Sequence, residues 1–190
     1  QYERRSVLQY QVISRLVGHS PLADTRPGPR PDSDDIYLQL PRRFSTKVRE
    51  LAERVVRIRE NPSDYGRARR IHDFLSDPKT FHYSLELEPR PEEEDPVEHF
   101  LLSGRKGNCE YFASAMVLML RCVGVRARLV NGFKGGEWNP YGGHITFRQR
   151  DAHSWAEVYV PSVGWETFDP SPGAETSSVR GTSGLMQRVR

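Results

Sequence analysis

The chain has 190 residues, a formal net charge of +3 and a pI near 9.0, and this length suits one domain with a sizeable core. Its basic residues are spread along the whole chain, which favours an ordinary solvated surface over a nucleic-acid-binding face. The most apolar segment, residues 112–120, is far shorter than the roughly 18 residues that a membrane-spanning helix needs. We therefore expect a soluble piece of a larger protein that binds no nucleic acid.

The two cysteines, Cys109 and Cys122, lie in one predicted helix and cannot form a disulfide with each other. At about 1.5 Å per residue their separation along the helix is about 20 Å, whereas bridged Cα atoms lie within about 7 Å. Two cysteines are also too few for a cysteine-rich metal site, and no cluster of histidines accompanies them. We expect neither a metal ion nor a cofactor.

The first half of the chain, after an N-terminal arm over residues 1–34, is predicted to be mainly helical. Apolar residues recur with the period of an amphipathic helix, and capping residues mark the helix starts. Ser63 or Asp64 is placed to cap the second helix, and Asp95 caps the third. A short strand over residues 81–87 separates these two helices. The predicted helices cover residues 46–59, 64–75, 96–102 and 108–121.

Gly124 is expected to end the last helix. Beyond it, apolar residues recur at every second position, which is the spacing typical of a strand. Helices followed by a meander of strands predict an α+β domain with an antiparallel sheet. This domain is expected to span residues 35–172, and residues 173–190, which lack periodicity, to form a disordered tail or linker. The predicted strands cover residues 125–133, 144–150, 153–160 and 165–169.

Cys109 is the candidate nucleophile because it stands at the start of the most apolar predicted helix, after Gly107 and Asn108. Free backbone N–H groups and the positive end of the helix dipole favour a thiolate at such a position. The same N–H groups are placed to steady an oxyanion on an attacked carbonyl. A small buried hydrophobe is the alternative role of a free cysteine. On position alone both roles stay open for Cys109, whereas Cys122, in the last turn, fits the buried role.

A thiolate enzyme needs a histidine to carry protons and a further group to orient that histidine. His72 lies on an apolar helix stripe and is expected to be a hydrogen-bonded core residue. His153 opens a predicted strand, and after a short turn the partner strand ends at Asp169. This hairpin brings the carboxylate back beside the imidazole, where it would fix the orientation of the ring and stabilise its protonated form.

The register of this hairpin decides whether Asp169 faces His153, because residues paired directly across a hairpin share a face. A four-residue loop would turn Asp169 away, and Asp151, two residues before His153, would become the carboxylate to consider. A loop of odd length, or a bulge, returns Asp169 to the face of His153. We expect this second arrangement, with one ring nitrogen within about 3.2 Å of Asp169 and the other about 3–4.5 Å from the Cys109 Sγ.

These residues stand in segments that, taken in order, resemble the transglutaminase-like superfamily. The likeness is greatest to a bacterial branch in which the domain lies outside the cytoplasmic membrane, between transmembrane segments. A further likeness extends upstream to residues 36–41 and 95–100. The segments that carry the resemblance are Gly107–Ala113, Leu120–Arg128, Asp151–Val158 and Gly164–Ser171.

The resemblance implies a papain-like core in which the helix of the nucleophile packs on the antiparallel sheet. It also implies that Cys109 is the nucleophile, His153 the acid and base, and Asp169 the orienting carboxylate. Animal members place an oxyanion-stabilising tryptophan upstream of the cysteine, whereas the three tryptophans of this chain follow it, so the second oxyanion donor is unassigned. Trp138, in a glycine-rich loop, and Glu110, next to the nucleophile, are the candidate substrate-binding residues.

Three functions stay open. The first is a thiol enzyme that passes an acyl group from a protein or peptide substrate to an amine, as in protein-glutamine cross-linking, or to water, as in a cysteine protease or amidase. The walls of the cleft, expected in residues 88–95 and 134–143, determine whether an amine or water accepts the acyl group.

The second is a non-catalytic binding module, which the intact triad disfavours. The third, a weak nucleic-acid binder, rests on the pI alone. By resemblance we expect a periplasmic or cell-surface domain of a membrane-anchored protein; the sequence gives no oligomeric state.

Overall fold

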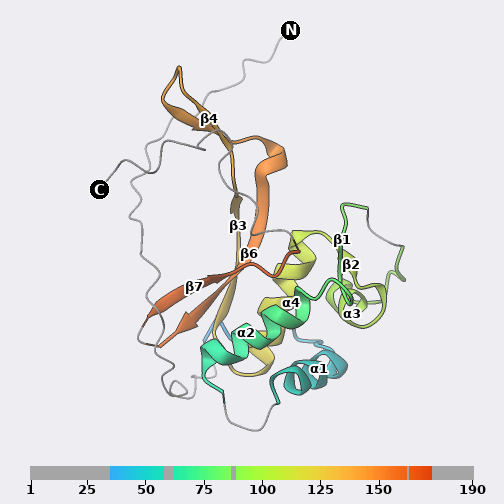
Figure 1. Cartoon of the computed structure of the whole chain (residues 1–190). Coiled ribbons are helices and arrows are strands. Elements are labelled where there is room, and N and C mark those ends of the chain that lie inside the picture. Colours follow the sequence, from blue (N-terminus) through green and yellow to red (C-terminus); the bar gives the residue numbers. More distant parts are fainter. Residues whose placement is uncertain (1–34, 58–61, 87–88, 162, 173–190) are drawn as a thin grey trace.

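A computed structural model of the chain describes residues 35–57, 62–86, 89–161 and 163–172. Helices occupy the first part of the described chain and strands the second, and the helices gather on one side of a small sheet (Figure 1). This arrangement confirms the predicted α+β class with an antiparallel sheet. The predicted arm over residues 1–34 and the predicted tail over residues 173–190 lie outside the described residues.

The first two helices begin where hydroxyl side chains cap them. Helix α1 spans Thr46–Val56 and helix α2 spans Asp64–Leu75. The Ser45 hydroxyl accepts from the backbone N–H of the third helical residue of α1, and the Ser63 hydroxyl does the same for α2. Ser63 is therefore the cap of α2, one of the two residues that the sequence offered for this position.

The third helix is shorter than predicted and widens into a π-helical turn. Helix α3 covers Pro96–His99, and Asp95 caps it by accepting from two backbone N–H groups. The chain then continues as the π-helical segment η1, Phe100–Gly104, which ends at Arg105 with a left-handed φ of 53°. The first two residues of η1, Phe100 and Leu101, are buried in the core. The helix predicted through residue 102 is therefore a regular α-helix only as far as His99, and the helical turns continue to Gly104.

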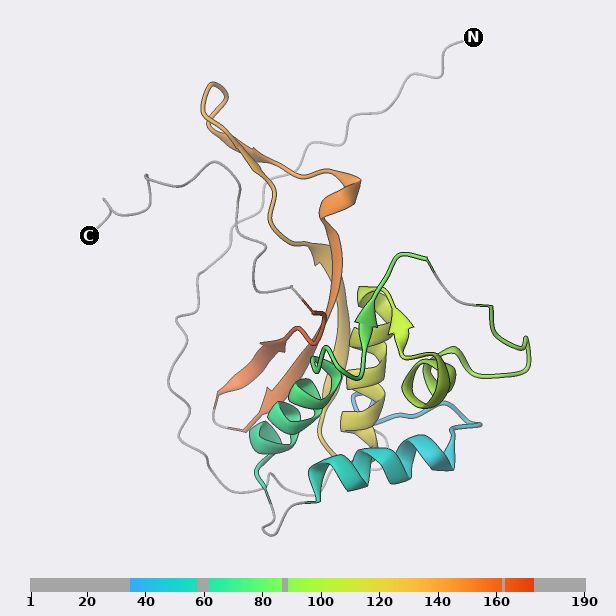
Figure 2. The same ribbon diagram turned by 45° about the vertical axis from the view of Figure 1, so that its right-hand side comes forward.

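Helix α4, Cys109–Cys122, is the centre of the core and contacts α1, α2 and the sheet (Figure 2). Asn108 caps its start, and Gly124, with a φ of 76°, follows its end in the left-handed conformation that glycine adopts without strain. Both boundaries agree with the prediction to within one residue. Its fully or almost fully buried apolar side chains are Phe112, Ala113, Ala115, Met116, Val117, Met119 and Leu120.

The main sheet has three antiparallel strands in the order β3-β6-β7. Strand β3 spans Ala127–Phe133, β6 spans Ala152–Val160 and β7 spans Gly164–Phe168. Along β6, buried side chains alternate with partly or fully exposed ones. The buried face packs with α4 in the core, and the other face carries His153 at the start of β6.

Between β3 and β6 the chain forms a separate hairpin that projects beyond the body of the domain (Figure 1). Its strands are β4, Glu137–Asn139, and β5, His144–Thr146. Residues 134–143, expected as a loop, contain the short strand β4. The strand expected over residues 144–150 forms from His144 but ends at Thr146, and a 3₁₀ turn, η2, follows over Gln149–Asp151.

The strand predicted at residues 81–87 is only two residues long in the described part of that segment. This strand, β1, covers His82–Tyr83 and pairs in parallel with β2, Lys106–Gly107, just before α4. Within the described ranges, no helix is long and apolar enough to cross a membrane.

Candidate active site

Cys109 is the first residue of α4, and the element before it fixes its position. The Asn108 side chain accepts from the backbone N–H of Glu110 at 3.1 Å, which holds the first turn of the helix. Strand β2 leads directly into this cap. Cys109 is partly buried, and its side chain therefore stands at a helix N-terminus that solvent still reaches.

Tyr83, which the sequence analysis did not single out, lies beside Cys109. In the β1–β2 pair its Cα is opposite Gly107, two residues before the cysteine. Its ring stacks on Phe112 with centroids 6.4 Å apart, which places its side chain over the first turn of α4. Burial and the neighbouring Cys109 raise the pKa of the Tyr83 phenol above its usual value, and the charge of Asp169 acts in the same direction.

The β6–β7 hairpin has the register that brings Asp169 to the face of His153. Tyr159 pairs with Trp165, and Val160 pairs with Gly164, so three residues form the loop. Continuing this register by one pair beyond β7 sets Asp169 opposite Trp155, which is two residues from His153 and on its face. The predicted odd-length loop is therefore confirmed.

His153 and Asp169 are directly hydrogen-bonded. The His153 Nε2 lies 2.7 Å from the Asp169 Oδ2, within the distance predicted from the sequence. The two side chains are well shielded, with 14% and 13% of their surfaces exposed. The Nδ1 of His153 is thereby the ring nitrogen left for Cys109, and its expected separation of about 3–4.5 Å from the Sγ stays a prediction.

Lys134 is a second partner of the same carboxylate oxygen. Its Nζ lies 2.6 Å from the Asp169 Oδ2. The backbone N–H of Lys134 donates to the carbonyl of Asp151, which extends the β3–β6 ladder by one pair past Phe133. This register places Lys134 on the face of His153, because two residues earlier Gly132 pairs with His153.

Helix α2 anchors the segment that carries the carboxylate. The His72 Nε2 lies 3.1 Å from the backbone carbonyl oxygen of Asp169, and the Ser76 hydroxyl donates to the carbonyl of Pro170 at 3.1 Å. The backbone N–H of Ser171 donates to the Asp169 Oδ1 at 3.2 Å. His72 is thus a hydrogen-bonded residue of the helix face, as predicted, and it holds the backbone of Asp169 rather than its carboxylate.

Burial alone would raise the pKa of Asp169, but the hydrogen bonds from His153 and Lys134 outweigh it and hold the pKa below its ordinary value. A carboxylate with a lowered pKa stabilises the folded state at pH values above about 4, and this contribution is lost as the pH falls through its folded-state pKa. Asp169 is therefore ionised at neutral pH and available to hold a protonated imidazole.

Lys134→Met should lower the free energy of unfolding by about 1 kcal/mol at pH 7 and by much less at a pH below the lowered folded-state pKa of Asp169. Protonated Asp169 no longer attracts the ammonium group of Lys134. At low pH the wild type has therefore already lost the interaction that the substitution removes. Urea unfolding of both proteins at the two pH values measures the difference. An equal loss at both pH values would mean that Lys134 acts through the packing of its aliphatic stem instead.

Asp151, the alternative carboxylate, lies at the end of η2 and is buried, with 6% of its surface exposed. Its Oδ2 accepts from the backbone N–H of Arg148 at 2.8 Å. Asp169, and not Asp151, is the carboxylate that is hydrogen-bonded to His153.

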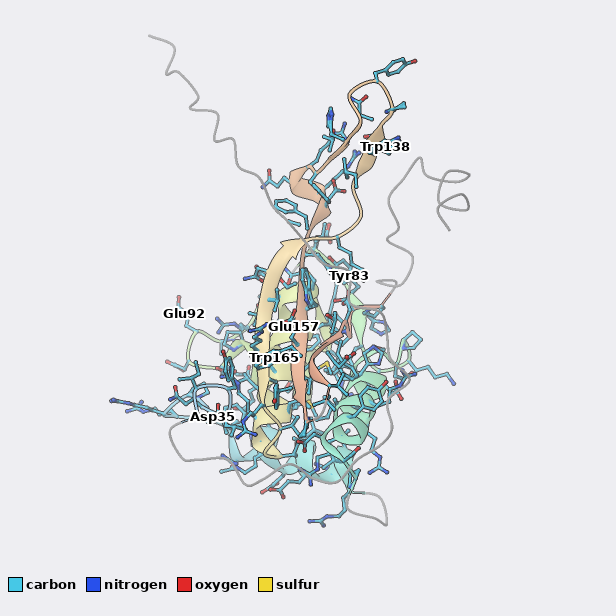
Figure 3. The ribbon with its side chains drawn as sticks, turned by 90° about the vertical axis from the view of Figure 1, so that its left-hand side faces the viewer. Asp35, Tyr83, Glu92, Trp138, Glu157 and Trp165 are labelled. Carbon is cyan, nitrogen blue, oxygen red and sulfur yellow. The ribbon has the colours of Figure 1, made fainter. Side chains whose placement is uncertain are left out.

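The two candidate substrate contacts lie in different places. Glu110, on the first turn of α4, lines a cavity of about 230 Å³ together with Val97, Tyr111 and two other residues. Trp138 lies on the projecting hairpin, where it pairs with Ile145, and Figure 3 shows it beyond the body of the domain. Their roles as substrate contacts stay predictions.

A second cavity of about 230 Å³ lies against the candidate carboxylate on the open face of the sheet. Asp169 and Lys134 form one side of it, and three strands supply the rest. The lining residues are Phe133, Lys134, Trp155, Glu157, Thr167 and Asp169. The hydrogen-bonded pair thus borders a hollow, and the side chains around it are both aromatic and charged.

The two thiols differ in their surroundings. Burial raises the pKa of the Cys122 thiol to about 11. At pH 8 only about one Cys122 side chain in a thousand is then a thiolate. Iodoacetamide at this pH should alkylate Cys109 in Cys122→Ala as fast as in the wild type and should label Cys109→Ala very slowly, as measured by mass spectrometry of the intact protein. Fast labelling of Cys109→Ala would show that Cys122 is the accessible thiolate.

The model of the transglutaminase-like superfamily matches residues 49–170, which include Cys109, His153 and Asp169. The chain belongs to the transglutaminase-like superfamily. This membership confirms the resemblance seen in the sequence and extends it upstream to α1. Within the superfamily, cysteine-based acyl transfer or protease activity is the general chemistry.

Two curated relatives and one solved structure illustrate the similarity. The chain is 38% identical over 144 residues to an uncharacterized protein, YebA, of Bacillus subtilis, and 35% identical over 134 residues to a protein-glutamine gamma-glutamyltransferase of Pseudomonas aeruginosa. These alignments cover 73% and 70% of this chain but only 19% of each relative. The chain therefore spans about a fifth of the length of the curated relatives.

The structural match is to the periplasmic domain of TgpA from Pseudomonas aeruginosa bound to ethylmercury. The TM-score is 0.65 at 32% identity, over 75% of this chain and 50% of the other. This neighbour confirms the predicted transglutaminase-like fold.

Proposed function

We propose that the protein is a thiol acyltransferase in which Cys109 attacks a carboxamide, with His153 as its acid and base and Asp169 as the orienting carboxylate. The observation that carries the proposal is the 2.7 Å hydrogen bond between His153 and Asp169 in a domain whose central helix begins at Cys109. The lowered pKa of Asp169 supports the same roles, because an ionised carboxylate stabilises the imidazolium form.

The proposed reaction has two halves. The Cys109 thiolate adds to the carbonyl carbon of a glutamine side chain, and the tetrahedral intermediate collapses to a thioester. His153 gives its proton to the departing ammonia. A primary amine then attacks the thioester, His153 takes the proton of the amine, and the thiolate leaves. The products are ammonia and a new amide bond, and the enzyme returns to its starting state.

Transfer to an amine is favoured here over transfer to water because the relative from Pseudomonas aeruginosa carries the name protein-glutamine gamma-glutamyltransferase. Hydrolysis by the same triad, as in a cysteine protease or amidase, is the alternative, since the superfamily includes this chemistry. A non-catalytic module is the second alternative. We also propose an extracytoplasmic location in a membrane-anchored parent protein, by analogy with the periplasmic domain of TgpA.

The test is a screen of acyl donors read by mass spectrometry. The protein is incubated with a glutamine peptide, with and without a primary amine, and in parallel with ordinary peptides that lack glutamine. The proposal expects the amine to be incorporated at glutamine with loss of ammonia. Conversion of glutamine to glutamate despite excess amine would identify an amidase, and cleaved backbones would identify a protease. No product with any donor would favour the binding module.

A further inference from the structure

Tyr83 is held next to the nucleophile by the backbone on both of its sides. The backbone N–H of His82 donates to the carbonyl of Arg105 at 2.9 Å, and that of Ser84 donates to the carbonyl of Gly107 at 2.8 Å. Tyr83 therefore stands across from the residues that lead into Cys109. Its position is set by main-chain pairing, and only its side chain is free to rotate.

Gly107 permits this close approach. A Cβ atom at Gly107 would lie 2.8 Å from the Cβ of Tyr111, so any side chain there would push β2 away from the first turn of α4. With glycine at this position, β2 stays against the helix, and β1 stays beside β2. The structure thus uses Gly107 to keep Tyr83 within reach of Cys109.

The Tyr83 side chain lies beside the start of α4, because its Cα is opposite Gly107 and its ring stacks on Phe112. Both the side chain and the backbone of Cys109 influence the pKa of the Tyr83 phenol, which agrees with a hydroxyl close to these two groups. A hydroxyl close to both the nucleophilic sulfur and the backbone N–H of Cys109 is near the position that a substrate's carbonyl oxygen takes when the sulfur attacks its carbon. Tyr83 is 43% exposed, so its side chain has room to turn towards solvent when a substrate enters.

We infer that Tyr83 is the second oxyanion donor of this site and acts together with the backbone N–H of Cys109. The inference rests on the proposed thiol chemistry. As the carbon–sulfur bond forms, the electron pair of the carbonyl moves to its oxygen, and both donors bind the resulting anion. Tyr83 keeps its proton throughout: the anion collapses to the thioester while His153 protonates the leaving group.

The state of the phenol suits this task. Burial and the neighbouring Cys109 raise the pKa of Tyr83 above its usual value near 10, so the side chain remains a protonated donor at neutral and mildly alkaline pH. A phenol that ionised readily would instead repel the anion.

The two tryptophans that lie on the main sheet are held by packing contacts, and Trp155 also stacks on the ring of His153 with centroids 6.3 Å apart. The Trp155 ring lies against Gly132, where an added Cβ would come within 2.7 Å of it. The Trp165 ring makes an edge contact with Tyr37 at 4.7 Å and lies 4.2 Å beneath the guanidinium of Arg128. These packing contacts leave Tyr83 as the aromatic donor beside the nucleophile.

The experiment compares two reactions of Cys109 in Tyr83→Phe, which removes the hydroxyl and keeps the ring. Acylation is followed as the burst of p-nitrophenol released from p-nitrophenyl acetate, and alkylation as the rate of labelling by iodoacetamide. Acylation passes through an oxyanion, whereas alkylation at the methylene carbon does not. We expect the acylation rate to fall about 10- to 100-fold and the alkylation rate to change less than about twofold. Tyr159→Phe, on the far part of β6, is the matched control and should leave both rates unchanged.

Two results would overturn the inference while leaving the proposed function intact. Equal or faster acylation in Tyr83→Phe would mean that the hydroxyl only blocks the site. Equal losses in acylation and alkylation would mean that it activates the thiol instead. A wild-type protein that shows no burst, although Cys109 is alkylated, would count against the proposed function itself and so against Tyr83 as well.

Discussion

Cys109→Ala is expected to abolish acyl transfer while the protein keeps its fold. The sulfur at this position forms the bond to the substrate, and no other group at the start of α4 can replace it. Its removal costs little packing, because Cys109 is only partly buried and the helix start is held by the Asn108 cap. Product formation from the best acyl donor measures the activity, and circular dichroism with thermal melting measures the fold.

Cys122→Ala is the control for this variant. It should keep its activity and lose about 1–2 kcal/mol of stability, because it leaves a small gap beside the core at the end of α4. An inactive Cys122→Ala together with an active Cys109→Ala would overturn the assignment of the nucleophile.

Asp169→Asn should lower the rate about 10²- to 10⁴-fold and lower the stability far less. Asparagine has no charge to stabilise the imidazolium, and its amide group can turn a donor towards the Nε2 of His153. The backbone of this segment keeps its bonds to His72 and Ser76, so the local structure should survive. Activity per folded molecule and the melting temperature together separate the two effects.

A structural carboxylate provides the comparison for Asp169. Asp35 forms an ion pair with Arg126 away from the triad and accepts from the backbone N–H of Tyr37. Asp35→Asn should therefore lower the melting temperature without changing the activity of the folded protein. If Asp169→Asn behaved in the same way, with a large fall in melting temperature and unchanged activity per folded molecule, Asp169 would be structural too.

The features of the fold that the sequence predicted well depend on short-range patterns. Ser63 and Asp95 cap helices by accepting from backbone N–H groups within three residues of themselves, and Gly124 follows the end of α4 with a left-handed φ. The π-helical turn after His99 and the β4–β5 hairpin were missed for different reasons. Phe100 and Leu101 of the π-helical turn pack into the core, which is a tertiary contact, whereas three-residue strands within a glycine-rich segment leave almost no period to detect.

In the candidate site, too, some residues could be predicted from short-range sequence patterns and others could not. Cys109, His153 and Asp169 stand in recognisable local settings, and the parity of one hairpin loop was enough to predict that the last two meet. Lys134 and Tyr83 reach the site through pairings between distant segments, Lys134 with Asp151 and Tyr83 with Gly107. Neither pairing leaves a pattern in a single sequence, although the missing upstream tryptophan was a reason to search for another donor before Cys109.

Trapping of the acyl-enzyme tests the central claim most directly. The wild-type protein is mixed with an activated acyl donor, quenched with acid during the burst, and digested for peptide mapping by mass spectrometry. Our account predicts one acyl group as a thioester on Cys109, none in Cys109→Ala, and loss of the adduct when a primary amine is added before the quench. An acyl group on another residue, or an unmodified Cys109 while the donor is consumed, would contradict it.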